Sequence, residues 1–251
     1  MIEPFFFGPS NQQVFASYHP PVGGGGQVLT VICPPLFNEY MRTHLALRDL
    51  AISLAGRGQH VLRIDYRGTG DSFDDLDEVA ISDWVEDIAL AMREGRDLSG
   101  SSVVRLLGVR VGALLACRSA GAFGDVHRLV LWDPVPDGAG YLQAMRRIQG
   151  ALIERGLSLS QTELRETLHE YAGHRLSERM VEDFNLLDES AYTSVPKSKL
   201  HVVSSSSEAG FPVQGVTRDV APFACDWETE LEDLMTPKPV LERLSACLTM
   251  S

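Results

Sequence analysis

Apolar residues along the chain alternate between short continuous runs and helically spaced positions. Runs of strand length occupy 28–33, 60–66, 103–109 and 128–132. Strands buried on both faces have this continuous apolar character, so the runs predict the centre of a sheet. Helical spacing lies between them, as at Leu47, Leu50, Ala51 and Leu54. Because parallel neighbours need crossover helices, the alternation predicts a doubly wound α/β fold with a mostly parallel sheet.

The two ends and the middle of the chain depart from this alternation. Residues 3–20 hold two short aromatic or β-branched segments around a Gly-Pro-Ser-Asn turn, which predicts a hairpin. We expect a helix near 83–93 with Asp83 and Glu86 at capping-box spacing, and a second near Ser160 and Glu163. Residues 138–195 carry helical periodicity without strands and predict a lid inserted into a single domain spanning 1–251. A last short strand is expected at 220–225, followed by a helix that opens at Pro237 or Pro239.

Composition limits the classes of binding partner and the cellular location that we expect. The 251 residues carry a formal net charge of −12, which argues against nucleic-acid and anionic-membrane binding. We see neither an export signal nor an apolar run long enough for a membrane span. The four cysteines lack Cys-x-x-Cys spacing, so we expect no disulfide framework, no metal site and no cofactor. A reduced, cytoplasmic location is the expectation that fits best.

The most informative motif is Gly108-Val109-Arg110-Val111-Gly112, which separates an apolar run from a helix of small residues. It reads as a strand, a tight elbow and a helix. Two glycines in such an elbow let the strand and the helix pack closely, and the central side chain is pushed out at the carboxyl end of the sheet. The central residue here is Arg110, which stays protonated and has no lone pair with which to attack a carbonyl.

Together with three other features, this elbow resembles the α/β-hydrolase superfamily over nearly the whole chain. The other features are Cys33-Pro34-Pro35 after one core strand, the turn at 65–72 after the next, and the helical insertion. More narrowly, the segments 34–40, 108–113 and 131–135 resemble hydrolase-like proteins associated with exosortase systems and some biosynthetic clusters. The resemblance implies an α/β-hydrolase fold, with a helical lid at 138–195.

The resemblance also implies a serine nucleophile, a histidine base and an acid, and two of these three roles are empty. Arg110 replaces the serine, and the final loop at 223–228 contains no histidine because the last histidine of the chain is His201. The acid would be Asp133 or Glu208, both at the carboxyl edge of the sheet. We therefore do not expect ordinary triad hydrolysis.

Arg110 has two interpretations. At a helix N-terminus it would make an electropositive pocket for a carboxylate, a phosphate or an acyl-carrier phosphate. Alternatively it fills the vacated triad space, paired with Glu39, Asp133 or Asp226. In the first interpretation the pocket binds an anionic or acyl-type small molecule or carrier, with Arg110, Glu39 and Asp133 as acid–base and electrostatic groups. The expected lining of this pocket is Pro35, Leu36, Phe37, Tyr40, Val111 and Trp227.

Each of these candidates has a competing explanation. Glu39 acts as a general base if apolar surroundings raise its pKa, or it serves the first turn of a helix. Cys33 is a displaced nucleophile of an ester or thioester hydrolase, or a buried apolar residue. Ser204 to Ser207 line the pocket or form a plain loop. A third class of function is a scaffold whose lid binds a protein partner or a second copy of the chain.

Overall fold

The computed structural model describes residues 2–154, 170–228 and 233–250. Within them an eight-stranded sheet has the order β1-β2-β4-β3-β5-β6-β7-β8. The pairs β1–β2 and β2–β4 are antiparallel and the other neighbours are parallel, which confirms the predicted hairpin and the mostly parallel sheet. The strands are β1 (Glu3–Phe7), β2 (Val14–His19), β3 (Val28–Cys33), β4 (His60–Ile64), β5 (Val103–Val109), β6 (Arg128–Trp132), β7 (Leu200–Ser204) and β8 (Thr217–Val220).

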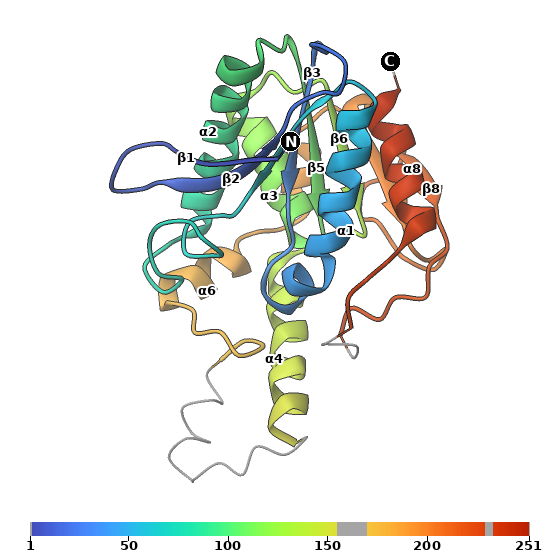
Figure 1. Cartoon of the computed structure of the whole chain (residues 1–251). Coiled ribbons are helices and arrows are strands. Elements are labelled where there is room, and N and C mark those ends of the chain that lie inside the picture. The colour runs from blue at the N-terminus through green and yellow to red at the C-terminus, as the bar shows by residue number, and fades with distance from the viewer. Residues whose placement is uncertain (1, 155–169, 229–232, 251) are drawn as a thin grey trace.

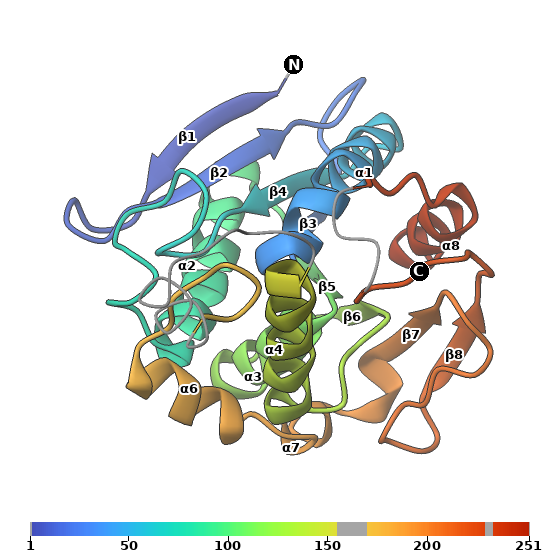
Figure 2. The same cartoon turned by 90° about the horizontal axis from the view of Figure 1, so that it is seen from below.

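Helices cover both faces of the sheet (Figures 1 and 2). On one face lie α1 (Phe37–Gly56) and α8 (Lys238–Thr249), and on the other lie α2 (Ile81–Ser99) and α3 (Val111–Phe123). Side chains of a strand alternate between the two layers. Leu106 of β5 joins the apolar cluster under α2 and α3, and its neighbour Leu107 joins the cluster under α1 and α8. The continuous apolar runs of the sequence therefore feed two cores, one on each face.

Three helices of the described residues lie between β6 and β7, where the lid was expected. They are α4 (Gly138–Glu154), α6 (Glu178–Asn185) and α7 (Ser190–Thr193), followed by a 3₁₀ turn at Lys197–Lys199. In Figure 1 α4 projects beyond the carboxyl ends of the strands, and Figure 2 shows it in front of β3 and β5. The helix expected at Ser160 and Glu163 lies outside the described residues. A covering role for this segment stays a prediction.

Three boundaries differ from the expectation. Helix α1 begins at Phe37, one residue after the two prolines at 34 and 35, which is earlier than the helical spacing from Leu47 indicates. Helix α2 begins at Ile81, so Asp83 is its third residue, and its Oδ2 accepts a hydrogen bond from the Ala80 N–H at 2.8 Å. The last strand is Thr217–Val220, not 220–225. This strand lies at the sheet edge and is largely exposed, so it lacks the apolar run by which the inner strands were found.

Among the described helices, none is both long enough and apolar enough to cross a membrane.

Candidate functional site

The elbow between β5 and α3 is built as the sequence predicts. Arg110 has φ 54° and ψ −121°, a strained backbone conformation for a residue with a side chain. The flanking glycines permit the tight turn. A Cβ on Gly112 would lie 2.4 Å from the Pro34 carbonyl oxygen, and a Cβ on Gly108 would lie 2.5 Å from the Ala113 Cα. Strand and helix can approach this closely only without side chains at the two positions, and the approach sets Arg110 at the carboxyl edge.

The Arg110 guanidinium is held by three neighbours. Its Nε donates to Glu39 Oε1 at 2.9 Å and its Nη1 donates to the Asp133 carbonyl oxygen at 3.0 Å. The Trp227 ring lies over it, with 4.7 Å between the guanidinium carbon and the ring centroid. Arg110 therefore has its internal partner in Glu39, one of the three acids considered for that role. The ion pair fixes both the position and the orientation of the guanidinium.

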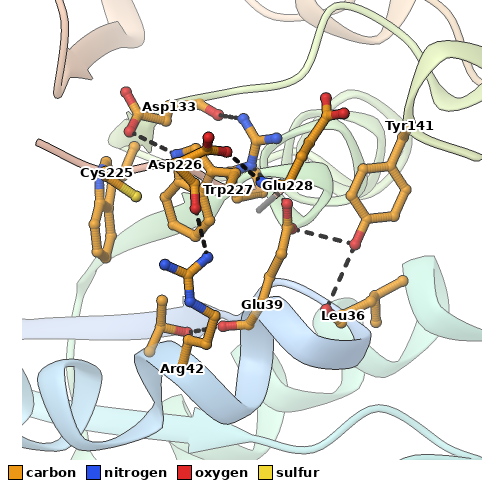
Figure 3. A network of polar contacts seen from close by, with 12 residues as sticks. Leu36, Glu39, Arg42, Asp133, Tyr141, Cys225, Asp226, Trp227 and Glu228 are labelled. Carbon is orange, nitrogen blue, oxygen red and sulfur yellow. Dashed lines mark hydrogen bonds and ion pairs between the residues drawn. The ribbon is translucent and has the colours of Figure 1, made fainter. Parts of the chain in front are cut away.

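Glu39 is almost completely buried, at 1 % exposure, in the first turn of α1. Its Oε2 accepts a hydrogen bond from the Tyr141 hydroxyl of α4 at 3.2 Å, as Figure 3 shows. Burial raises the pKa of the Glu39 carboxyl, while the Arg110 charge and the Tyr141 hydrogen bond act in the opposite direction. The Glu39 carboxylate in turn raises the pKa of Arg110. The site thus contains a mutually stabilised, largely desolvated pair of charges.

Asp133 follows β6 and has a positive φ of 41°. Its carboxylate accepts hydrogen bonds from the Ser205 N–H at 2.7 Å, from the Ser205 hydroxyl at 2.6 Å and from the Trp227 Nε1 at 3.1 Å. Glu208, the other candidate acid, is exposed. Of the two candidate acids, Asp133 is the one that lines the cavity, and its partners are a serine and a tryptophan where a hydrolase needs a histidine.

The final loop is anchored from below by Arg42 of α1. Its Nη1 donates to the Asp226 carbonyl oxygen at 2.8 Å (Figure 3). Its Nε donates to the Asp233 carbonyl oxygen at 3.3 Å. The same loop presents Trp227 to Arg110 and to Trp132, whose ring centroid lies 5.6 Å from that of Trp227. Arg42 is buried, at 2 % exposure, and its hydrogen bonds to the loop help to position Trp227 over the Arg110 guanidinium.

A cavity of about 140 Å³ opens beside the guanidinium. Arg110, Asp133 and Trp227 form one wall, and a second, more open hollow along the final loop also borders Arg110, Cys225 and Trp227. Apart from Phe223, the rest of the cavity lining is small or polar, namely Pro134, Ser204, Ser205, Ser206, Ala209, Gly210 and Cys225. The volume is below that of typical pockets for drug-sized ligands, so it suits a small group or the end of a longer molecule.

The structure brings together four of the candidate residues, Arg110, Glu39, Asp133 and Trp227. The other expected lining residues lie elsewhere. Pro35, Leu36, Phe37 and Val111 are buried and do not border these two cavities. Tyr40 donates to Asp65 Oδ1 at 2.6 Å and so supports the turn after β4.

Two contacts were missed from the sequence, those of Tyr141 and Arg42. Tyr141 lies in α4, whose spacing indicated only a packed helix face, and Arg42 lies one turn after Glu39 in a helix whose start was misplaced. For Tyr141 the sequence carries no specific signal. For Arg42 there was a signal. In a helix that begins at Phe37, Arg42 lies one turn after Glu39 and therefore on the same side of the helix.

Cys33 does not have the environment of a nucleophile. It is fully buried beneath the elbow, and desolvation raises the pKa of its thiol far above the usual range. A thiol in such surroundings stays protonated and unreactive. Burial and the raised thiol pKa therefore argue against Cys33 as the displaced nucleophile.

The described histidines supply no base to the site. His44 contacts the Met41 carbonyl oxygen, and His174 packs against Phe37. His201 lies near the start of β7, at the end away from Ser204 and Ser205. Among the described residues, no histidine hydrogen-bonds a hydroxyl or thiol at the carboxyl edge.

Solved structures with the same architecture cover nearly the whole chain. Est1E from Butyrivibrio proteoclasticus, solved with ferulic acid bound, has a TM-score of 0.69 at 14% identity, and the alignment covers 97% of each chain. The thioesterase domain from the curacin biosynthetic pathway has a TM-score of 0.59 at 15% identity over all of both chains. The chain has the α/β-hydrolase fold. Mouse alpha/beta hydrolase domain-containing protein 10 shares this fold with a TM-score of 0.55 at 15% identity, and 98% of this chain and 96% of that chain are aligned.

No protein-family model and no curated protein sequence matches the chain. At these identities the shared α/β-hydrolase fold fixes the scaffold alone, so function has to be argued from the site.

Proposed function

We propose that this protein is a non-hydrolytic α/β-hydrolase homologue that binds the carbonyl or carboxylate end of a small acyl compound through Arg110. The observation that carries the proposal is the clamped guanidinium beside the cavity. Its Nε and Nη1 are engaged by Glu39 and Asp133, while Nη2 makes no hydrogen bond with any described residue. A prepositioned donor on a residue that lines a small cavity is suited to an acceptor oxygen of a ligand.

The charges around the site favour a weakly charged ligand. Glu39 already compensates Arg110, and the Asp133 carboxylate lies at the cavity wall. A doubly charged phosphate would therefore face more negative than positive charge, because the net field decides which anion enters. A neutral acyl carbonyl, or a single carboxylate, needs only the free N–H of Arg110. Two of the similar structures, a thioesterase domain and Est1E bound to ferulic acid, agree with an acyl ligand.

The loss of hydrolysis is part of the proposal and rests on the chemistry of the residues. The elbow holds no nucleophile, Cys33 is inert, and Ser205 donates directly to Asp133 without an imidazole between them. Acyl transfer through a serine needs a base that removes its proton. A reduced, cytoplasmic setting, a carrier-borne acyl group, and a role beside exosortase systems or in a biosynthetic cluster are retained as predictions for this function. The neighbouring genes would test the last of these.

The test is a ligand panel read by thermal shift and calorimetry. Short acyl thioesters of N-acetylcysteamine, the matching carboxylates and inorganic phosphate would be compared. We expect a thioester or a carboxylate to stabilise the folded protein, by about 2.7 kcal/mol at a hundredfold excess over Kd, and phosphate to have no effect. The double variant Arg110→Gln/Glu39→Gln, which removes both charges of the pair, should lose this stabilisation. The control Arg147→Gln removes an exposed arginine and should keep it.

A second test measures the mass of the intact protein after exposure to a fluorophosphonate. Stoichiometric labelling of a serine, together with turnover of a thioester, would contradict the proposal. Binding of phosphate in preference to every acyl compound would likewise replace the acyl ligand by a different anion. The scaffold alternative predicts no response to the panel and a larger apparent mass with a partner. That partner surface, expected on the lid, stays a prediction.

A further inference from the structure

A second cluster of chemically capable side chains lies away from Arg110, where β7, β8 and α8 meet (Figure 2). It consists of His201 of β7, Asp219 of β8 and Cys247 of α8. His201 and Cys247 are buried, whereas Asp219 is half-buried and opens the cluster to solvent on one side. His201 precedes the cavity-lining Ser204 by three positions in β7, so the cluster lies toward the amino end of the strands.

The register of the two strands explains why these residues meet. Val203 pairs with Asp219 and His201 pairs with Thr217, so His201 and Asp219 are diagonal neighbours on one face of the sheet. Val203 and Cys247 belong to the apolar cluster under α1 and α8. That face is therefore the one that α8 covers. Arg128 Nη1 donates to the Cys247 carbonyl oxygen at 3.0 Å and holds the last turn of the helix over the strands.

The three ligand-type atoms converge on one point. His201 Nε2 lies 2.7 Å from Asp219 Oδ2 and 3.3 Å from Cys247 Sγ, and Sγ lies 3.5 Å from Oδ2. In a proton relay the imidazole uses its two nitrogens for two different partners. Here a single nitrogen, Nε2, faces both the carboxylate and the thiol. This is how ligands surround a shared ion.

The distances fit a tetrahedral zinc ion after a small expansion. Zinc bonds of the usual lengths to N, O and S put neighbouring ligand atoms about 3.3–3.7 Å apart at tetrahedral angles. The two distances to Cys247 Sγ already lie in or near this range, and only the His201–Asp219 distance has to open. Asp219 can move because its side chain is 27 % exposed. A thiolate, an imidazole and a carboxylate form a donor set typical of zinc, and the thiolate and carboxylate charges balance those of the ion.

From this convergence we propose that His201, Asp219 and Cys247 form a zinc site that ties the C-terminal helix to the last two strands. The fourth position faces solvent beside Asp219 and takes a water molecule. The site does not depend on the function proposed for Arg110. Residue spacing could not reveal it, because the ligands come from three separate elements and no two of them form a recognised metal-binding motif. The proposal departs from the expectation, drawn from cysteine spacing, of a chain without a metal site.

A nearby cation provides a sharp internal control. Arg243 Nη1 lies 3.8 Å from Asp219 Oδ2, and the Arg243 side chain is 45 % exposed. Its charge competes with a metal ion for the same carboxylate. We therefore expect Arg243→Gln to bind the ion more tightly than the wild type, a change opposite in direction to that of any ligand substitution.

The experiment is a titration of chelator-treated full-length protein with Co²⁺, a spectroscopic substitute for Zn²⁺. We expect one cobalt ion per chain, the intense visible bands of a tetrahedral ion, and a near-ultraviolet band from thiolate-to-cobalt charge transfer. Zn²⁺ should displace the cobalt and raise the unfolding temperature. Cys247→Ser should lose the charge-transfer band, and the isosteric Asp219→Asn should weaken binding by at least about tenfold. Cys225→Ser is the matched control and should behave as the wild type.

Circular dichroism checks that each variant is folded. If Cys247→Ser does not fold, the metal affinity of Asp219→Asn tests the site instead. The proposal is overturned by folded wild type without cobalt bands at millimolar Co²⁺. It is equally overturned if the charge-transfer band survives in Cys247→Ser or disappears in Cys225→Ser, because the thiolate would then come from another cysteine. Unchanged affinity in Asp219→Asn would remove the carboxylate from the site.

Discussion

Arg110 and Glu39 depend on each other for their charges. Glu39 is buried at 1 % exposure, and Arg110 keeps only 15 % of its side chain exposed. Removing one member of a buried pair is costly because it leaves the other charge desolvated without a partner. Replacing both members by glutamine leaves two neutral polar side chains that can still hydrogen-bond. The energetic cost of the pair is therefore a property of the two residues together.

A double-mutant cycle on this pair should show strong coupling. Arg110→Gln should destabilise the protein by about 3–5 kcal/mol, since Tyr141 alone remains to hydrogen-bond the buried carboxylate. Glu39→Gln should cost less, because Arg110 keeps the Asp133 carbonyl and the Trp227 ring. The double variant should be more stable than the sum of the single effects predicts, by about 1–3 kcal/mol in urea unfolding. Strict additivity would contradict the assigned pairing.

His19 makes the folded protein sensitive to acid. It is buried at the end of β2, and its Nε2 has no hydrogen-bond partner among the described residues. Desolvation, helped by the Arg63 charge, lowers the pKa of His19 from 6.5 to about 4. Between these values the unfolded chain binds the proton and the folded chain does not. The contribution of neutral His19 to stability is therefore complete above pH 6.5 and is lost as the pH falls toward 4.

Replacing His19 should make the free energy of unfolding less dependent on pH below 6.5. In His19→Gln, the decrease in the free energy of unfolding between pH 6.5 and pH 4 should be smaller than in the wild type, by about 3 kcal/mol. Urea titrations at several pH values measure it. The exposed His127 serves as the control, and His127→Gln should retain the wild-type slope. An identical slope in His19→Gln would show that this ring does not titrate with unfolding.

At the level of elements, the elbow depends on the close approach of α3 to β3 and β5. Gly112→Ala introduces a Cβ at 2.4 Å from the Pro34 carbonyl oxygen, a distance that can be relieved only by moving backbone. We expect a loss of about 2–3 kcal/mol in the free energy of unfolding, typical of overpacking. Gly150→Ala is the matched control in α4, where no described atom outside the helix's own backbone lies within 4 Å of the added methyl. It should be neutral or stabilise by about 0.5–1 kcal/mol.

The elements that could be predicted were those with a strong apolar pattern. The inner strands at 28–33 and 128–132 have the expected bounds because both of their faces are buried. The edge strand Thr217–Val220 has no such pattern, and its position depends on pairing with β7. The start of α1 was missed because the two prolines indicated a longer loop. Local sequence does not encode how early a helix can begin once tertiary contacts hold its first turn.

The same limit applies to the candidate site. The elbow motif places Arg110, and the strand ends place Asp133, because the carboxyl edge of a parallel sheet follows from topology. The sequence left open which acid pairs with Arg110. The structure shows that it is Glu39, because α1 places that side chain next to the guanidinium. Tyr141 and the Arg42 anchor depend on the packing of distant segments. The zinc cluster depends on strand register and on the docking of α8, so it was invisible from the sequence.

In the whole molecule, the sheet keeps its two polar clusters apart. The Arg110 cavity lies at the carboxyl edge of the sheet, and the His201 cluster lies toward the amino end of β7. Buried apolar side chains of the β6 and β7 strands occupy the space between the two ends. The functional proposal and the zinc proposal can therefore be tested independently, since a substitution at one end of the sheet leaves the contacts at the other intact.

The buried pair at the elbow also limits how this protein can evolve. Restoring a serine at position 110 by itself would strand the Glu39 carboxylate in the core, and changing Glu39 first would leave Arg110 without its counter-ion. We expect each single change to destabilise the fold, because it leaves one charge of the pair buried without its partner. A new histidine in the final loop would still be required. The arginine elbow thus makes a nucleophile at position 110 costly to acquire, because the change has to be accompanied by a second change at Glu39.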